Sequence, residues 1–283
     1  MNVLDFGGLP TSLGEIINFK HHLDAIKHNY DKIIISFHTE LWKTGLHTNA
    51  SDWHVKKALW DKYIKDIGQL FFSQPPYELR PVSTKFGGDI NQFIATMNIR
   101  PQKSEVGHLL CKGTPLNIGE YIVITTKTRE FHRHQFDHIA PQFWSIIKEI
   151  SKKYKVVILG EKMVEMRKEY MGLNPRPFGI YNDIVNNLPQ ECIVDLSVPA
   201  LGETVSDLSK IQQDCLIMKE AKFTISFGCG GNHCLSAAVS DMAIGYRTDN
   251  FSYNDTIFNH REYPNAIITK NPEHFLQTLR HYI

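Results

Sequence analysis

The chain has 283 residues, of which 42% are apolar and 22% are charged, and its formal net charge at pH 7 is +1. This length is enough for one large or two modest domains with a buried core. The small net charge argues against binding to nucleic acid or to an anionic membrane through a strong electrostatic field. The chain begins without a signal pattern and has no apolar run approaching about 18 residues. We therefore expect a cytoplasmic protein, while loose attachment to a membrane surface stays open.

Five cysteines are spread over positions 111, 192, 215, 229 and 234, and none forms a Cys-x-x-Cys pair. This usage is typical of a reducing compartment and argues against a zinc ribbon or a disulfide framework. His132 and His134 have a spacing that metal ligands also use, but they stand in a polar loop beside arginines. They are better explained as solvated or acceptor-facing side chains. The sequence predicts no metal site and no cofactor.

The first half opens with a strand at 3–6, and an unbroken apolar run predicts a buried second strand at 32–37. Between them, apolar residues recur at helical spacing. Ser12 and Glu15 form a capping-box pattern at the start of that helix, so Glu15 can serve as a helix cap alone. The end of a first strand is also where α/β proteins place catalytic groups. Both interpretations of Glu15 stay open at this point.

The segment from residue 38 to residue 115 shows fewer patterns. Residues 70–72 resemble a strand that stops before Pro75-Pro76, and a helix is expected near 90–97. The aromatic side chains in this segment fit packing beneath a long loop better than stacking on sugar rings.

The second half alternates strands and helices more regularly. Strands are predicted at 121–126, 155–160, 193–196, 223–227, 243–246 and 265–269, and helices at 143–154, 206–219, 234–239 and 272–282. Such alternation indicates parallel sheets. Two runs of this kind, divided near residues 110–120, predict two Rossmann-like α/β domains, 1–115 and 116–283, that face a central cleft. The last helix can pack back toward the first domain.

A glycine turn joins the strand at 223–227 to a helix of small residues. Gly228, Gly230 and Gly231 interrupt the chain, and Asn232 can act as the N-cap. Free backbone N–H groups and the positive end of a helix dipole would meet there, an arrangement that suits a phosphate or a diphosphate. The alternative is that the glycines only form a tight turn.

The order of these parts resembles the two-domain GT-B glycosyltransferases, and most closely glycosyltransferase family 9, the heptosyltransferase-like enzymes. Residues 12–25 resemble that family's turn and helix after the first strand, and residues 124–129 resemble the opening of its C-terminal domain. Residues 195–238, and above all the loop Phe227-Gly-Cys-Gly-Gly-Asn-His-Cys-Leu-Ser-Ala-Ala238, resemble its donor loop. The sequence departs from the family at two positions, with Glu15 and Gly228 where the family commonly has aspartates.

The resemblance implies transfer of a sugar from a nucleotide-diphosphate sugar to a glycan hydroxyl, by an inverting reaction that needs no metal. Glu15 is then the candidate catalytic base. The donor and its diphosphate would contact Thr125, Thr126, Lys127, Arg129, Gly228, Gly230, Gly231, Asn232 and His233. Residues of the acceptor side or of the cleft would be Gly8, Ser12, Gly14 and His38. His233 can bond a phosphate or cap its helix.

Two other classes of function stay open. A nucleotide-sugar epimerase or a polysaccharide pyruvyl transferase uses similar paired domains. A nucleotide- or glycan-binding protein that has lost its chemistry would also fit, and Gly228 in place of an acid favours that alternative. The sequence does not predict the donor sugar, the acceptor or the oligomeric state.

Overall fold

The computed structural model describes residues 1–6, 13–38, 65–82, 106–126, 136–163, 180–200, 208–227, 231–247 and 265–283. The description of the fold and of the site concerns these residues.

A three-stranded parallel sheet forms the first half, in the order β1-β2-β3. Its strands are β1 (Val3–Phe6), β2 (Lys32–His38) and β3 (Tyr77–Val82). Helix α1 (Leu13–Ile26) and the 3-10 turn η1 (Lys27–Asn29) connect β1 to β2. The unbroken isoleucine run at the start of β2 is buried, as expected for the central strand of a parallel sheet.

A six-stranded parallel sheet forms the second half, in the order β11-β10-β9-β4-β5-β7. Its strands are β4 (Tyr121–Thr125), β5 (Lys155–Leu159), β7 (Ile193–Asp195), β9 (Thr224–Phe227), β10 (Ala243–Tyr246) and β11 (Ala266–Thr269). The short strands β6 (Glu161–Met163) and β8 (Val198–Ala200) pair with each other in a separate parallel sheet.

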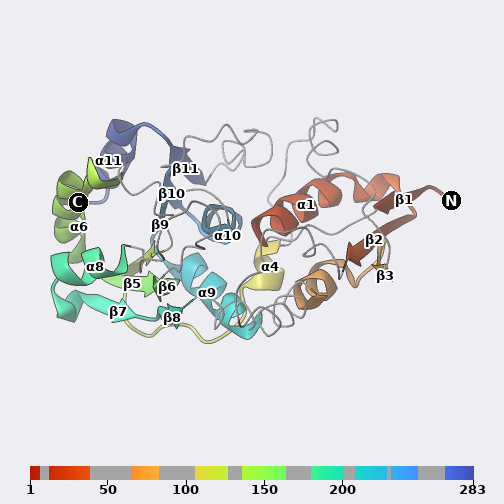
Figure 1. The fold of residues 1–283 in the computed structure, drawn as a ribbon, viewed down its shortest axis with the longest axis horizontal. Helices are drawn as coiled ribbons and strands as arrows, with labels where there is room; N and C mark the ends of the chain where they lie inside the picture. The colour runs from red at the N-terminus through yellow and green to blue at the C-terminus, as the bar shows by residue number, and fades with distance from the viewer. Residues whose placement is uncertain are drawn as a thin grey trace, which may run out of the picture.

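Helices cover both faces of the six-stranded sheet (Figure 1). They are α6 (Ala140–Ser151), α8 (Tyr181–Asn187), α9 (Leu208–Glu220), α10 (Gly231–Val239) and α11 (Pro272–Arg280). The short helix α4 (Val106–Leu110) packs on other helices, and the 3-10 turn η4 (Gln190–Cys192) precedes β7. Side chains on β4 alternate between the two faces, as a strand requires. Ile122 and Ile124 join the core beneath α6, α8 and α11, whereas Tyr121 and Val123 join the core beneath α9 and α10.

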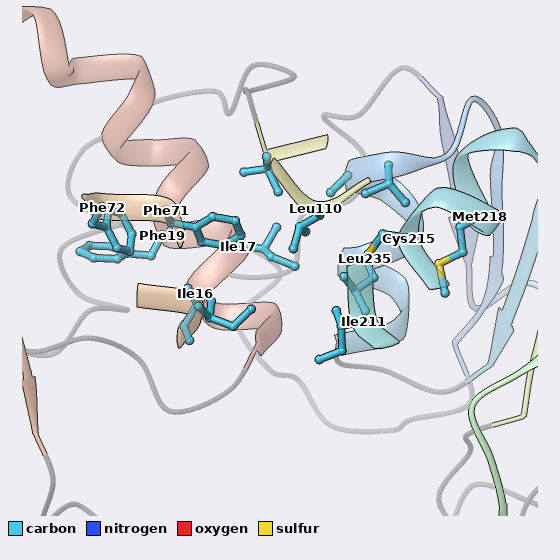
Figure 2. Close-up of a cluster of buried hydrophobic side chains, with 14 of the residues drawn as sticks. Ile16, Ile17, Phe19, Phe71, Phe72, Leu110, Ile211, Cys215, Met218 and Leu235 are labelled. Atoms are coloured by element: carbon cyan, nitrogen blue, oxygen red, sulfur yellow. The ribbon is translucent and has the colours of Figure 1, made fainter. Parts of the chain in front are cut away.

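The core beneath α9 and α10 continues into the first half of the chain. Helix α1 packs against α10, and α4 contacts α1, α9 and α10. Ile16 and Ile17 of α1 belong to the same buried cluster as Leu110 of α4, Ile211 of α9 and Leu235 of α10 (Figure 2). We call this contact of four helices the joint. A continuous apolar core therefore connects the two sheets.

The structure confirms the α/β fold class with parallel sheets, and one local prediction was wrong. Residues 65–72 form a helix, not a strand at 70–72. Ile67, Phe71 and Phe72 are buried on one helical face. The three adjacent apolar residues at 70–72 suggested a strand, whereas the helical spacing includes Ile67. The strand lies further on, in β3. The helix expected near 90–97 lies outside the described residues.

The closing helix, for which packing toward the first half was also considered, packs on β10, β11 and α6. Phe275, Leu276 and Leu279 of α11 are buried in the core of the second half. Within the described part of the chain, no helix combines the length and the apolar character needed to cross a membrane.

Candidate functional site

The strand order of the second sheet defines a topological switch point. The chain runs outward from β4 to β5 and β7, returns to β9 beside β4, and then runs outward in the opposite direction to β10 and β11. In open parallel sheets, ligands bind outside the carboxyl ends of the strands at this point. The carboxyl ends of β4 and β9 are the two places that the sequence singled out for donor binding.

Thr125 and Thr126 lie at the carboxyl end of β4, and both are buried. The Thr125 hydroxyl donates to the carbonyl of Ile225 on β9 at 3.3 Å. The backbone N–H of Thr126 donates to Leu159 on β5 at 2.9 Å, and its carbonyl accepts from Ile180 at 3.3 Å. These bonds hold β4 between its neighbours at the switch point. Contact of either threonine with a donor stays a prediction, and Lys127 and Arg129 lie outside the described residues.

Helix α10 begins at Gly231, three residues before the start that the sequence suggested. Gly231, Asn232 and His233 therefore make up its first turn, where backbone N–H groups have no partner within the helix and the dipole is positive. This turn follows β9 at the switch point. Gly228 and Gly230 lie outside the described residues. The capping role of Asn232 and a contact of His233 with a phosphate stay predictions.

Small side chains let α10 pack closely against its neighbours. Ser236, Ala237 and Ala238 are buried, and a Cβ placed on Gly107 of α4 would lie 3.4 Å from the Ala238 carbonyl oxygen. At this carboxyl end of the helix, the Asn265 side chain donates to the carbonyls of Ala237 and Ser240 at 3.1 and 2.6 Å. The position of α10 is thus fixed at its carboxyl end and along one side.

The acceptor-side candidates lie at the corresponding edge of the first sheet. Gly14 and Glu15 are in the first turn of α1, which follows β1, and His38 is the last residue of β2. Since β1 and β2 are parallel and paired, their carboxyl ends share one edge. Gly8 and Ser12 lie outside the described residues. The structure describes the backbone of Glu15 but not its side chain, so its catalytic role stays a prediction.

The joint connects the acceptor-side candidates on α1 with the donor-side candidates on α10. Ile16 and Ile17 directly follow Glu15, and Leu235 lies two residues beyond His233. All three apolar side chains belong to the joint. The first turns of α1 and α10 are therefore both anchored by the same apolar core, immediately next to the residues predicted to act on the substrate.

A polar cluster lies where β5 and β7 end. The sequence assigned no role to its members, although Asp195 begins the segment that resembles the donor loop. The Lys162 ammonium and the Tyr181 hydroxyl reach the same Asp195 carboxylate oxygen at 2.7 and 2.8 Å, and the Ser197 backbone N–H donates to the other oxygen at 3.0 Å. Burial acts to raise the pKa of Asp195, but the hydrogen bonds from Lys162, Ser197 and Tyr181 together bring that pKa below its usual value.

Arg247 was also missed. It directly follows β10, is 8% exposed, and donates its backbone N–H to Thr269 on β11 at 2.8 Å. Tyr246 is in register with Phe227, so Arg247 follows β10 at the level where the glycine turn follows β9. The signal that could have identified Arg247 and Asp195 is positional, because both stand at the carboxyl end of a strand in a parallel sheet.

Among the side chains that the structure describes, no three histidines, cysteines or acidic residues are grouped so that they could hold a metal ion. His132 and His134 lie outside those residues. The four described cysteines are free thiols, at positions 111, 192, 215 and 234.

The chain matches no protein-family model and no curated protein sequence. Its fold is similar to that of several solved structures. ADP-heptose lps heptosyltransferase II of E. coli aligns with 100% of this chain and 98% of its own, with a TM-score of 0.50 and 14% identity. The E. coli heptosyltransferase WaaC, solved with ADP-2-deoxy-2-fluoro heptose, aligns with 99% of this chain and 96% of its own, with a TM-score of 0.47 and 11% identity.

The iron-containing dodecameric glycosyltransferase TibC of enterotoxigenic E. coli aligns with 99% of this chain and 72% of its own, with a TM-score of 0.43 and 15% identity. The alignment with heptosyltransferase II over both full lengths shows that this chain has the GT-B-type fold. The fold that the sequence resemblance implied is thereby confirmed.

Proposed function

We propose that the protein is a glycosyltransferase that moves a sugar from a nucleotide-diphosphate sugar to a hydroxyl of a glycan or glycoconjugate. One observation carries the proposal. The first turn of α10 follows β9 at the switch point between β4 and β9, and α10 packs against α1, the helix that follows the first strand of the other sheet. The similar fold of an ADP-heptose heptosyltransferase supports this function.

The proposed reaction is a single displacement at the anomeric carbon. The Glu15 carboxylate takes the proton of the acceptor hydroxyl, and the acceptor oxygen forms a bond to the anomeric carbon from the face opposite the diphosphate. The bond from that carbon to the phosphate oxygen breaks, and its electron pair leaves with the nucleoside diphosphate. The configuration of the sugar is thereby inverted, and the proton remains on Glu15.

The leaving diphosphate gains negative charge as this bond breaks. We propose that backbone N–H groups of Gly230, Gly231 and Asn232 and the positive end of the α10 dipole stabilise this charge without a metal. Lys127 and Arg129, after β4, would add cationic contacts from the other side of the switch point. Groups that are fixed before the reaction give more stabilisation than groups that must reorganise, and the packing of α10 supplies that rigidity.

A second candidate is a nucleotide- or glycan-binding protein without catalysis, which Gly228 favours because it replaces an acid of the donor loop. A nucleotide-sugar epimerase or a pyruvyl transferase is the remaining alternative. These classes differ in what they release from a nucleotide sugar.

The experiment is to incubate the protein with a panel of UDP-, GDP- and ADP-sugars and to separate the products by chromatography. Slow release of free nucleotide is expected, because a glycosyltransferase without its acceptor transfers the sugar to water. A changed sugar on an intact nucleotide would indicate an epimerase, and binding without turnover would indicate the non-catalytic protein. Absence of both binding and turnover across the panel would contradict the proposal.

A further inference from the structure

The segment that leads from the first half into β4 is clamped onto helices of the second half. We call residues 106–114 the spacer. Its first part, α4, contacts α1, α9 and α10, and Val106 and Leu110 are buried in the joint. Gly107 approaches the backbone of α10 so closely that a Cβ would lie 3.4 Å from the Ala238 oxygen. The spacer therefore contacts both the helix that carries Glu15 and the helix that begins at Gly231, and these two helices also pack directly against each other (Figure 2).

Two neighbouring glutamines of α9 fix this segment at two points, Leu109 and Thr114. The Gln213 side-chain amide donates to the Thr114 carbonyl at 2.7 Å, and its oxygen accepts from the Thr114 backbone N–H at 2.8 Å. Gln212 donates to the Leu109 carbonyl at 3.1 Å. Gln213 thus pairs with both backbone groups of one residue, as a neighbouring strand would, although Thr114 belongs to no sheet.

Gly113 makes room for this pairing. Its φ of +145° lies in a region that other residues rarely adopt, and a Cβ there would lie only 2.1 Å from the Gln213 side-chain oxygen. A side chain at position 113 would therefore displace the Gln213 amide from Thr114. Gly113 and Gln213 therefore depend on each other: the glycine leaves the space that the Gln213 side chain of α9 occupies. We call this the Gly113–Gln213 contact.

We propose that Gln213 is a positioning residue: by locking the spacer to α9, it sets the placement of the first turn of α1 relative to the first turn of α10. Gln213 contacts no substrate and acts through the spacer and the joint. The meaning of this placement for sugar transfer rests on the proposed function, whereas the placement itself is testable without any ligand.

The first test is amide hydrogen exchange of the whole protein in the variant Gln213→Ala. Exchange is expected to become about tenfold faster in the spacer and in α1, because two hydrogen bonds to Thr114 are lost, while α11 stays unchanged. The matched control is Gln277→Ala, which removes an exposed helical glutamine that donates to Glu273 at 3.0 Å. Unchanged exchange in α1, or equally faster exchange in all segments, would overturn the proposal.

A second pair of variants tests the Gly113–Gln213 contact by substituting the glycine. Gly113→Ala should speed exchange in the same segments as Gln213→Ala, and the double variant should be no worse than Gly113→Ala alone, because both substitutions remove the same interaction. Gly119→Ala is the control, since Gly119 also has positive φ, at +81°, but a Cβ there would meet no atom within 4 Å. Additive effects of Gly113→Ala and Gln213→Ala on exchange would show that the two residues do not act through one contact.

The third measurement uses the nucleotide sugar on which the wild-type protein is found to act. Gln213→Ala should lower kcat by about tenfold or more and leave the donor KM unchanged, because the misplacement affects the two lobes relative to each other and not the donor site. Equal decreases of kcat in Gln213→Ala and Gln277→Ala would overturn the part of the proposal that concerns sugar transfer. If the wild-type protein acts on no donor, the proposed function fails, and the exchange experiment alone decides the proposal.

Discussion

The ring of Phe136 meets the ring of Phe227 edge to face, with 4.9 Å between the ring centroids. Phe227 is the last residue of β9, directly before Gly228, and Phe136 follows Lys127 and Arg129 in the sequence. Both rings are buried. This contact therefore joins the carboxyl end of β9 to the segment that begins at Phe136.

The variant Phe136→Leu should weaken nucleotide binding as well as stability. We expect a loss of about 1–2 kcal/mol in the free energy of unfolding, since the edge-to-face contact and part of the packing are lost. Binding of UDP, GDP or ADP, whichever the protein binds, should weaken because the segment after β4 is held less firmly. Urea unfolding and isothermal titration calorimetry measure the two effects.

The matched control is Phe275→Leu on α11. Phe275 is buried in the same aromatic cluster, with its ring centroid 6.0 Å from that of Phe227, but it belongs to neither of these two segments. A similar loss of stability with unchanged nucleotide binding is expected. If both substitutions weaken binding to the same extent, the contact between Phe136 and Phe227 has no special role.

Removal of the carboxylate at position 15 tests the proposed base. Glu15→Gln should lower the rate of sugar transfer by about 10²–10⁴-fold, because a neutral amide cannot take the acceptor proton. The affinity for the donor should not change, since the diphosphate would be held from the other sheet. Initial rates and nucleotide titrations distinguish the two effects. Glu120→Gln serves as the control, because this exposed carboxylate lies at the opposite, amino end of β4. A Glu15→Gln variant that transfers sugar at the wild-type rate would exclude Glu15 as the base.

The pair of Asp195 and Lys162 predicts a dependence of stability on acid pH. Hydrogen bonds overcome the effect of burial and lower the pKa of Asp195 in the folded state. A carboxylate of this kind stabilises the fold above its unfolded-state pKa of about 3.9, and the stabilisation is lost as the pH falls through the lower folded-state pKa. Asp195→Asn should therefore cost about 1 kcal/mol at pH 7, a small value because the pair is partly exposed.

The cost of Asp195→Asn should shrink as the pH falls below the unfolded-state pKa and disappear once the pH is below the lowered pKa of the folded state. Urea unfolding of the wild-type protein and the variant between pH 7 and pH 2.5 measures this difference. Asp241→Asn, which removes a carboxylate from an exposed position, controls for the change in net charge. A cost for Asp195→Asn that stays constant over the whole range would contradict the assigned interaction.

Local composition predicted the strands that the sheets bury most completely. The β-branched runs in β2, β4, β5 and β9 have no other favourable structure, and the glycine turn after β9 marked the start of α10. Strand β3 escaped notice because Glu78, Arg80 and Pro81 interrupt its apolar pattern, which an edge strand tolerates.

The joint could not be predicted from any local pattern. Lys20, His21 and His22 would place one side of α1 in solvent, yet all three side chains are buried. They are buried because α1 packs against α10 and shares a buried cluster with β2 and β3, a fact of tertiary packing alone. The Lys20 ammonium pairs with Asp24, which also accepts a hydrogen bond from the Tyr77 hydroxyl at 2.6 Å. Partners from β3 and from the same helix thus compensate for the buried charge.

The candidate site, like the fold, could be predicted from the sequence only in part. Its donor turn was visible as a strand, a glycine turn and a helix in sequence order. Arg247 was not visible, because its nearness to the switch point depends on the order of strands in the sheet. Sequence spacing contains no information on that order until the parallel pairings are known.

The Asn265 side chain tests how firmly the carboxyl end of α10 must be held. Its amide donates to the carbonyls of Ala237 and Ser240, so Asn265→Asp replaces a donor by an anion that faces two carbonyl oxygens. We expect a loss of about 2 kcal/mol or more in the free energy of unfolding at pH 7, and a smaller loss for Asn265→Ala. Burial and repulsion would raise the pKa of the new carboxyl group above its unfolded-state value. The loss is therefore greatest above that raised pKa and shrinks as the pH falls below it, because the neutral acid can donate.

Asn271→Asp is the matched control, because it makes the same chemical change at a position of opposite hydrogen-bond polarity. The Asn271 side-chain oxygen caps α11 by accepting from the His274 backbone N–H at 3.1 Å, and an aspartate accepts equally well there. Stability at pH 7 should be unchanged or slightly higher in that variant, since a negative charge is favourable at a helix N-terminus. Urea unfolding of the four proteins at pH 7 and pH 4 measures these differences. Equal effects of the two aspartate substitutions would show that charge alone, and not the donation from Asn265 to the end of α10, determines the outcome.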